Sequence, residues 1–250
     1  MTINITKAFR SKKQLVYEAI RTAILRCELE PGARLVIDDL AQRLDVSPGP
    51  VRESLAQLQA EGLVDAGPHG SVTVGKLDAR SIREIFDLLQ ALEIISMREA
   101  CHKMSDADLD EIEGLLKAMD RRLDDPEFFL QSELRLHWRI CDLAGLVLVG
   151  NFLGRTNDHW DRLRRYYLRD VWAGRIPATH RGHWRLLEAL RARDADRAEQ
   201  IIRDQIRSAC KAYITELEAR GNHTAVANGE RRDTPSNPGA AVDVRNQIQA

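Results

Sequence analysis

Apolar side chains in the first quarter of the chain repeat every three or four positions, which predicts three short helices. The first spans residues 12–27, and a Glu-Pro-Gly turn at 30–32 ends it. The second runs from about Ile37 to Leu44, and the third begins at Pro48 and ends near Gly62. The faces expected to be buried are Val16, Ile20, Ala23, Ile24 and Cys27, then Leu40, Ala41 and Leu44, then Val51, Leu55 and Leu58.

Two short β-like stretches follow the third helix. They are Leu63–Ala66 and Ser71–Val74, and the turn-forming residues Gly67-Pro68-His69-Gly70 join them into an expected hairpin. The order helix, helix, turn, helix, hairpin is the plan of a winged helix-turn-helix. In that plan the helix after the turn can enter the major groove of DNA.

The remainder of the chain shows helical periodicity only. We expect residues 1–75 to form the winged helix-turn-helix, 76–80 a linker, 81–220 an all-helical bundle, and 221–250 a disordered tail. Six helical patterns begin near Ile82, Ser105, Pro126, Asn151, Pro177 and Asp194. The fold class is therefore mainly α, a winged helix-turn-helix followed by a bundle of six or seven helices.

The amino-acid composition is typical of a globular protein, and the lack of long apolar segments indicates its cellular compartment. Apolar residues make up 44% of the chain, which is too many for wholesale disorder. The longest uncharged apolar run, residues 144–150, is far shorter than a membrane span, and no apolar segment follows the N-terminus. The four cysteines are widely separated, so we expect reduced thiols rather than a disulfide scaffold or a zinc finger. A cytoplasmic protein without membrane contact is expected.

Charge is distributed unevenly along the chain, although the net charge is only −1. Residues 1–26 contain six lysines and arginines but a single acidic residue, Glu18. A basic N-terminal end is compatible with contact to a polyanion and also with an ordinary solvated surface.

Three segments resemble the DNA-binding domain of the GntR family of bacterial transcription regulators. They are ELEPGARL at 28–35, LAQRLDVSPGPVRESLAQLQAEGLV at 40–64, and HG at 69–70. The helical remainder resembles the FCD effector domain of the FadR-like subgroup through sparser markers: Leu92-Glu93, Glu133 with His137, His183 before Leu186-Leu187, and Asp194 with Ala198. The resemblance implies a homodimer on a palindromic operator, regulated by a small organic acid bound inside the bundle.

The candidate DNA-reading residues lie at the start of the third helix and at the hairpin tip. Arg52 can bind guanine bidentately or a phosphate, although a surface pair with Glu53 is the alternative. Ser47 is either a phosphate ligand or only a helix cap. His69 and Gly70 match the family wing, where glycine permits close approach to DNA.

One departure from the family pattern affects the expected operator. The family usually has arginine, threonine and proline after the serine, whereas here Pro48-Gly49-Pro50 follows Ser47. A base-reading cation is therefore missing at position 48. We expect an operator that differs from the common family site, with phosphate contacts supplying more of the affinity.

The resemblance also implies a metal site in altered form. Many subgroup members hold a divalent metal through one aspartate and three histidines, and the matching positions here are Glu133, His137, His183 and Gln205. Two imidazoles and a carboxylate can still bind zinc, nickel or manganese with open positions, while glutamine offers only a weak carbonyl ligand. Hydrogen-bonded core histidines without metal are the alternative.

An anionic effector could instead be held by arginine, which clamps carboxylates well. Residues 155–181 contain seven arginines, of which one or two are expected to face the pocket. The subgroup often has another arginine where this chain has Leu89, which leaves room for a less polar effector.

These features favour a ligand-responsive transcription regulator, most simply a repressor, without catalytic residues. A metal-dependent hydrolase using Glu133, His137 and His183 would leave the N-terminal domain unexplained. A helical scaffold that binds only protein would leave the residues from Ser47 to Arg52, at the start of the third helix, unexplained.

Overall fold

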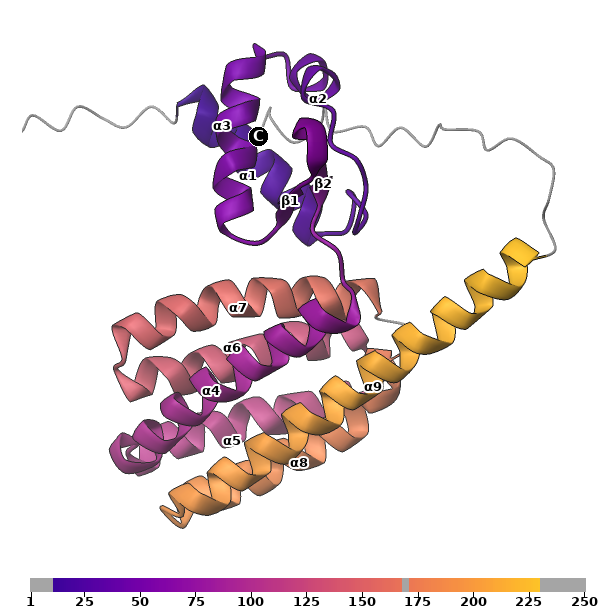
Figure 1. Ribbon diagram of the computed structural model, residues 1–250. Helices are drawn as coiled ribbons and strands as arrows, with labels where there is room; N and C mark the ends of the chain where they lie inside the picture. The colour runs from indigo at the N-terminus through magenta and orange to yellow at the C-terminus, as the bar shows by residue number, and fades with distance from the viewer. Residues whose placement is uncertain (1–10, 168–170, 230–250) are drawn as a thin grey trace, which may run out of the picture. The chain divides into compact units, whose positions relative to one another are not determined.

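The computed structural model describes residues 11–167 and 171–229. The chain divides into two compact units after Leu77. Within the described residues there are nine α-helices and one two-stranded sheet, and all of the long helices belong to the second unit (Figure 1). The mainly helical fold class is confirmed.

The first unit is a winged helix-turn-helix. Its elements are α1 (Lys12–Leu25), α2 (Ile37–Arg43), α3 (Pro48–Ala60), β1 (Val64–Ala66) and β2 (Val72–Val74). The predicted apolar faces meet in one core, in which Ile24, Val51 and Leu58 are fully buried. Cys27 is an exception, since α1 ends at Leu25 and Cys27 adopts a φ of 59°, outside the helical range.

The predicted hairpin is present and has a partner that the sequence did not indicate. β1 and β2 pair antiparallel with Val64 opposite Val74, and a short 3₁₀ turn, Pro68–Gly70, connects them. A bridge between Arg34 and Thr73 adds residues 33–35 to the outer edge of β2. The backbone N–H of Leu35 donates to the Val72 carbonyl at 2.8 Å. The loop after α1 therefore ties the wing to the helices.

The second unit contains the six helices that the periodicity predicts. They are α4 (Ala79–Lys103), α5 (Asp106–Asp120), α6 (Pro126–Ala144), α7 (Val147–Tyr166), α8 (Ala173–Arg191) and α9 (Ala195–Gly229). A capping box formed by Ser105 and Asp108 starts α5 at the position that the sequence predicts. Asp194 caps α9 by accepting a hydrogen bond from the Arg197 backbone at 2.9 Å. Helices α4 and α9 pack side by side along much of their length (Figure 1).

The starts of two helices differ from the sequence prediction. α7 begins at Val147 rather than near Asn151, and it ends at Tyr166. α8 begins at Ala173, so Pro177 lies inside it instead of opening it. Pro177 is the fifth residue of α8, and its missing N–H removes one intrahelical hydrogen bond.

The C-terminal boundary also differs, because α9 continues to Gly229. Residues 221–229, assigned to the disordered tail, are therefore helical. No proline interrupts the chain there, and adding residues to an existing helix avoids the cost of nucleation. The rest of the predicted tail, 230–250, lies outside the described residues.

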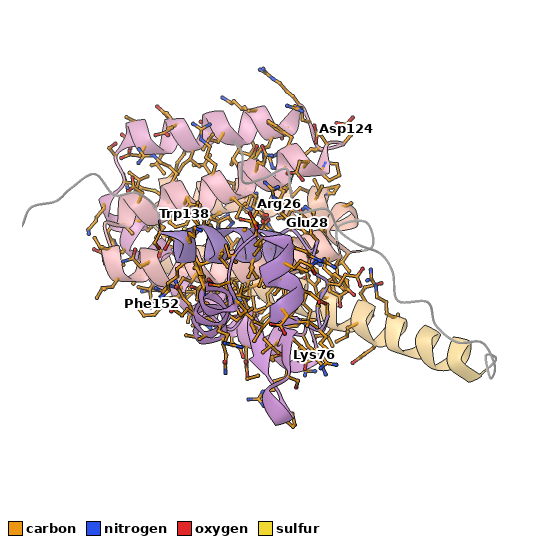
Figure 2. The ribbon with its side chains drawn as sticks, turned by 90° about the horizontal axis from the view of Figure 1, so that it is seen from above. Arg26, Glu28, Lys76, Asp124, Trp138 and Phe152 are labelled. Carbon is orange, nitrogen blue, oxygen red and sulfur yellow. The ribbon has the colours of Figure 1, made fainter. Side chains whose placement is uncertain are left out.

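The surface of the second unit exposes several large apolar side chains. Val147 and Leu148 at the start of α7 are 77% and 75% exposed. Trp138 on α6 and Phe152 on α7, both marked in Figure 2, are also exposed. In the described part of the chain, no helix combines the length and apolarity that crossing a membrane requires. All four cysteines are free thiols, and two of them, Cys101 and Cys141, are buried.

Candidate functional site

The start of α3 presents unpaired polar groups to solvent. Ser47 precedes the helix and is exposed, and its hydroxyl makes no capping hydrogen bond. Gly49, in the first turn, has open space where a Cβ would stand. Pro48 and Pro50 carry no N–H, so in this first turn the amide of Gly49 is the exposed N–H that lacks an intrahelical partner and can attract phosphate. This end of α3 therefore has the chemistry of a phosphate contact.

Arg52 is exposed one turn into α3, and the described residues place no carboxylate within 4.0 Å of it. Glu53, the alternative partner, instead pairs with Lys13 of α1 at 3.1 Å. Arg21 and Arg26 also form ion pairs, with Glu61 at 3.2 Å and Glu28 at 3.9 Å. Arg26 and Glu28 are marked in Figure 2. The charges of Lys13, Arg21 and Arg26 are thus neutralised within the unit, whereas the charge of Arg52 is not.

The tip of the wing is built around two glycines. Gly70 has a φ of +74° and an exposed, uncrowded position. At Gly67 a Cβ would lie 2.5 Å from the hydroxyl of Ser71, which would have to turn away from the Pro68 carbonyl that accepts its hydrogen bond. The side chain of His69 lies outside the described residues.

In the second unit, all four positions implied by the resemblance line one partly open cavity of about 50 Å³. Glu133 and His137 lie one turn apart on α6, His183 comes from α8, and Gln205 comes from α9. A carboxylate oxygen of Glu133 and one ring nitrogen from each histidine lie within 4.8 Å of one another. Three helices distant in sequence therefore bring the predicted set together.

The donor set fits a divalent metal ion. Nδ1 of His137 lies 3.3 Å from Glu93 of α4, which orients the ring and leaves Nε2 as the possible ligand atom. Nε2 of His183 lies 3.7 Å from Glu133 Oε1. Burial, together with the nearby His137 and His180, lowers the pKa of His183 well below its usual value, which favours the neutral form of the ring that metal binding requires.

Gln205 stands at the position of the family's third histidine, and its side chain occupies space that the lack of a side chain at Gly182 leaves open. Its amide nitrogen donates to the carbonyl of Thr179 at 3.2 Å. A Cβ at Gly182 would lie only 2.0 Å from that nitrogen, so the absent side chain of Gly182 makes room for Gln205.

A buried arginine occupies the other side of Glu133. Arg164 of α7 is 1% exposed and forms an ion pair with Glu133 Oε2. Its guanidinium also lies 5.1 Å from the ring centroids of both Trp160 and Trp172. Burial raises the pKa of Glu133 and Arg164 opposes that rise, because the cation stabilises the carboxylate.

Of the seven arginines noted in residues 155–181, the structure selects Arg164 and Arg175 as the two near the cavity. Arg175 of α8 lines it directly, and burial lowers the pKa of its guanidinium. Arg155 and Arg181 are exposed, and Arg165 pairs with Asp161 at 2.9 Å. Arg162 is buried, and Arg169 lies outside the described residues.

Sequence reasoning gave no role to Glu93, although Leu92-Glu93 was among the markers of the resemblance. Glu93 and Leu89 lie one turn apart on α4 and both line the cavity. Leu89 is buried, so an apolar wall stands where the subgroup often has arginine. The other apolar lining residues are Phe86, Trp160, Trp172, Ile206 and Ala209.

Comparison with known proteins agrees with the two units. The family described as bacterial regulatory proteins, gntR family, matches residues 12–74, and the FCD domain matches residues 84–208. A helix-turn-helix transcriptional regulator in an unstable DNA locus of Streptomyces ambofaciens is 29% identical over 200 residues, covering 80% of this chain and 84% of the relative. The transcriptional repressor RspR of Escherichia coli K12 is 26% identical over 192 residues, covering 75% and 82%.

Solved structures show the same fold. McbR/YncC of Escherichia coli superimposes with a TM-score of 0.65 at 20% identity, covering 83% of this chain and 99% of that one. A GntR regulator from Rhodococcus sp. RHA1 gives 0.63 at 20% identity, covering 82% and 98%. The matched families and relatives are transcriptional regulators rather than enzymes. The chain therefore belongs to the GntR family of bacterial transcription regulators and carries an FCD domain.

Proposed function

We propose that this regulator binds a palindromic operator as a homodimer in the cytoplasm, and that a small organic acid bound in its helical unit changes its affinity for DNA. The observation that carries the proposal is the cavity between α4, α6, α8 and α9, on which the ionisable side chains of Glu133 and His183 are buried. Ionisable groups are costly to bury, and their presence around a cavity is typical of a binding site. A repressor is the simplest assignment, supported by the name of the relative RspR.

On the DNA side, we assign the exposed start of α3 to the major groove. Ser47 and the first turn around Gly49 contact phosphate, and Arg52 contacts a base edge or phosphate. His69 and Gly70 at the wing tip approach the adjacent backbone. Because Pro48 replaces the usual arginine, binding-site selection from random DNA is expected to return a motif different from the common family site. Recovery of the common site unchanged would contradict this assignment.

In the helical unit, Glu133, His137 and His183 would hold a divalent transition metal such as zinc, nickel or manganese. A bound ion would supply a Lewis-acidic anchor for the effector's carboxylate. Glu93 orients His137, and Arg164 competes for the charge of Glu133, so we expect weaker binding than at a site with three histidines.

The metal proposal is tested by elemental analysis of untagged protein purified without chelator. We expect a transition metal in about a one-to-one ratio to the chain, and its loss in His183→Ala. A content below about 0.2 per chain, with no rise in melting temperature on adding zinc, would reject it.

The homodimer is supported by the exposed apolar side chains of α6 and α7. Trp138, Val147, Leu148 and Phe152 are all exposed, and Trp138 and Val147 line the same hollow at the junction of α6 and α7. Exposed apolar side chains that lie together mark protein–protein contact. Sedimentation equilibrium is expected to give a dimer for the wild type and a shift toward monomer for Leu148→Glu. An unchanged dimer in that variant would move the interface elsewhere.

The central test is DNA binding by the full chain. Fluorescence anisotropy with the promoter DNA upstream of its own gene is expected to show salt-dependent binding, with affinity that changes when metabolites are added. Arg52→Ala should bind more weakly, whereas Arg80→Ala, on an exposed ion pair of α4, should bind normally. Failure to bind promoter DNA at low ionic strength, with and without metabolites, would refute the proposal.

A further inference from the structure

Arg164 is a buried cation with one anionic partner. It lies in the last turn of α7 at 1% exposure, where a charge is costly unless a counter-charge accompanies it. Its Nη1 donates to Oε2 of Glu133, and among the described residues this is its only ion pair. Its Nε and Nη2 are also buried and have no hydrogen-bond partner in the described part of the chain. The guanidinium is therefore compensated mainly by one carboxylate.

That carboxylate is also the one anion of the candidate metal set. Oε1 of Glu133 faces Nε2 of His183 at 3.7 Å, whereas Oε2 is taken by Arg164. The ligand atoms of Glu133, His137 and His183 lie within 4.8 Å of one another. A divalent ion held by this set would thus share a single negative charge with the guanidinium. Two cations so close repel each other strongly, because the protein interior screens charge far less than water does.

The pKa of Glu133 shows the influence of the arginine. Burial raises this pKa, and the positive charge of Arg164 is the largest of the effects that lower it, ahead of that of His137. The arginine thus favours the ionised carboxylate without any metal. The chain itself supplies the positive charge that a metal ion would otherwise bring to Glu133.

We propose that Arg164 is an internal counter-ion of the site, which neutralises Glu133 in the metal-free protein and gives up that carboxylate when a divalent metal binds. This inference rests on the metal site of the proposed function and concerns its regulation. It makes Arg164 a positioning residue rather than a metal ligand. The metal-free and metal-loaded proteins then differ in the position of one buried side chain at the end of α7.

Two indole rings are placed to hold the guanidinium after it leaves Glu133. The ring centroids of Trp160, on α7, and of Trp172, just before α8, each lie 5.1 Å from the guanidinium carbon of Arg164. An aromatic face stabilises a desolvated cation, so the arginine has an alternative contact within the core. Movement of a charge against these rings also alters their fluorescence, which gives the displacement an optical signal.

The test is calorimetric titration of untagged, metal-free protein with zinc chloride. Arg164→Met should bind zinc about tenfold or more tightly than the wild type, because no internal cation competes for Glu133. Arg164→Lys retains the charge and should bind zinc as the wild type does. Arg165→Met removes the neighbouring cation of α7, which pairs with Asp161 at 2.9 Å, and should also match the wild type.

A second neutral variant covers a failure of Arg164→Met to fold. Arg164→Gln removes the charge but retains a hydrogen-bond donor for Glu133, and it should show the same gain in zinc affinity. At a fixed zinc concentration, the melting temperature of either neutral variant should rise by more than that of the wild type, because stabilisation grows with affinity. Zinc affinity in the neutral variants that is equal to or weaker than in the wild type, or no zinc binding by any of them, would overturn the inference.

Tryptophan emission tests whether the side chain moves. Zinc has a filled d shell and does not itself absorb the emission, so a change reports the surroundings of the indoles. The wild type should show a change in emission on zinc binding, and Arg164→Met a smaller one. An equal change in both proteins would show that Arg164 stays in place and would overturn the displacement.

The wild type distinguishes this inference from the metal proposal. Zinc binding by the neutral variants but not by the wild type would refute the metal site of the natural chain and support the counter-ion. Zinc binding of equal affinity in the wild type and the neutral variants would do the reverse.

Discussion

Replacing Arg164 by methionine removes one partner of the buried ion pair with Glu133. Both residues are almost fully enclosed, Arg164 at 1% and Glu133 at 5% exposure. Methionine retains much of the apolar volume between Trp160 and Trp172, so the main change is an uncompensated carboxylate in the core. We expect the helical unit to lose stability for this reason rather than through a cavity.

The size of the loss follows from the burial. Leaving one charge of a buried pair without its partner costs about 3–5 kcal/mol, and a central value of about 4 kcal/mol is expected here. For a protein of this length each kcal/mol shifts the melting temperature by about 2–4 °C, so the transition should fall by about 8–16 °C. Burial already raises the pKa of Glu133. Protonation of Glu133 in the variant would reduce the loss of stability toward the lower end of this range.

Urea unfolding followed by tryptophan fluorescence measures this loss selectively, because all four tryptophans lie in the second unit. The double variant Arg164→Met with Glu133→Met should recover at least half of the lost stability, since apolar replacement of a whole buried pair is often neutral. Arg80→Met, which removes an exposed pair with Glu84, is the control and should not change the transition. A loss of unfolding free energy below about 1 kcal/mol, or no recovery in the double variant, would contradict the reasoning. Either result would show that Arg164 is not needed to compensate the buried charge of Glu133.

Three further changes test other parts of the structure. Gly182→Ala places a Cβ where Gln205 now lies, 2.0 Å from its amide nitrogen, and should cost about 1–3 kcal/mol in urea unfolding. Adding Gln205→Ala should restore most of that loss, and no restoration would mean that the clash is elsewhere. Gly70→Ala forces a φ of +74° on a residue with a Cβ, so the wing should be less stable by about 1–3 kcal/mol and DNA binding weaker, while tryptophan-detected unfolding stays unchanged. Arg52→Ala should weaken operator binding by about 1–3 kcal/mol and relax the sequence preference at one position if it contacts a base. A uniform loss across all sequences, with a smaller salt slope, would assign Arg52 to phosphate instead.

The sequence by itself determined the parts of this protein that depend on neighbours along the chain. Helical periodicity and turn residues located the winged helix-turn-helix and the six helices of the bundle, because an amphipathic face must be buried whatever it packs against. The spacing of Glu133 and His137 placed both on one face of α6, which is a local property of the helix. Family resemblance supplied His183 and Gln205 as their companions.

Only the tertiary structure decided which charges meet. Seven arginines between residues 155 and 181 are equivalent in the sequence, and the packing of α7 and α8 against α6 and α9 selects Arg164 and Arg175. The cavity brings together Phe86 of α4 and Ile206 of α9, which are more than a hundred positions apart in the sequence. Residues 33–35 pair with β2 across a separation of 39 positions, from Arg34 to Thr73. The course of α8 through Pro177 likewise follows from packing that outweighs one lost hydrogen bond. Such choices depend on long-range contacts, which local periodicity does not encode.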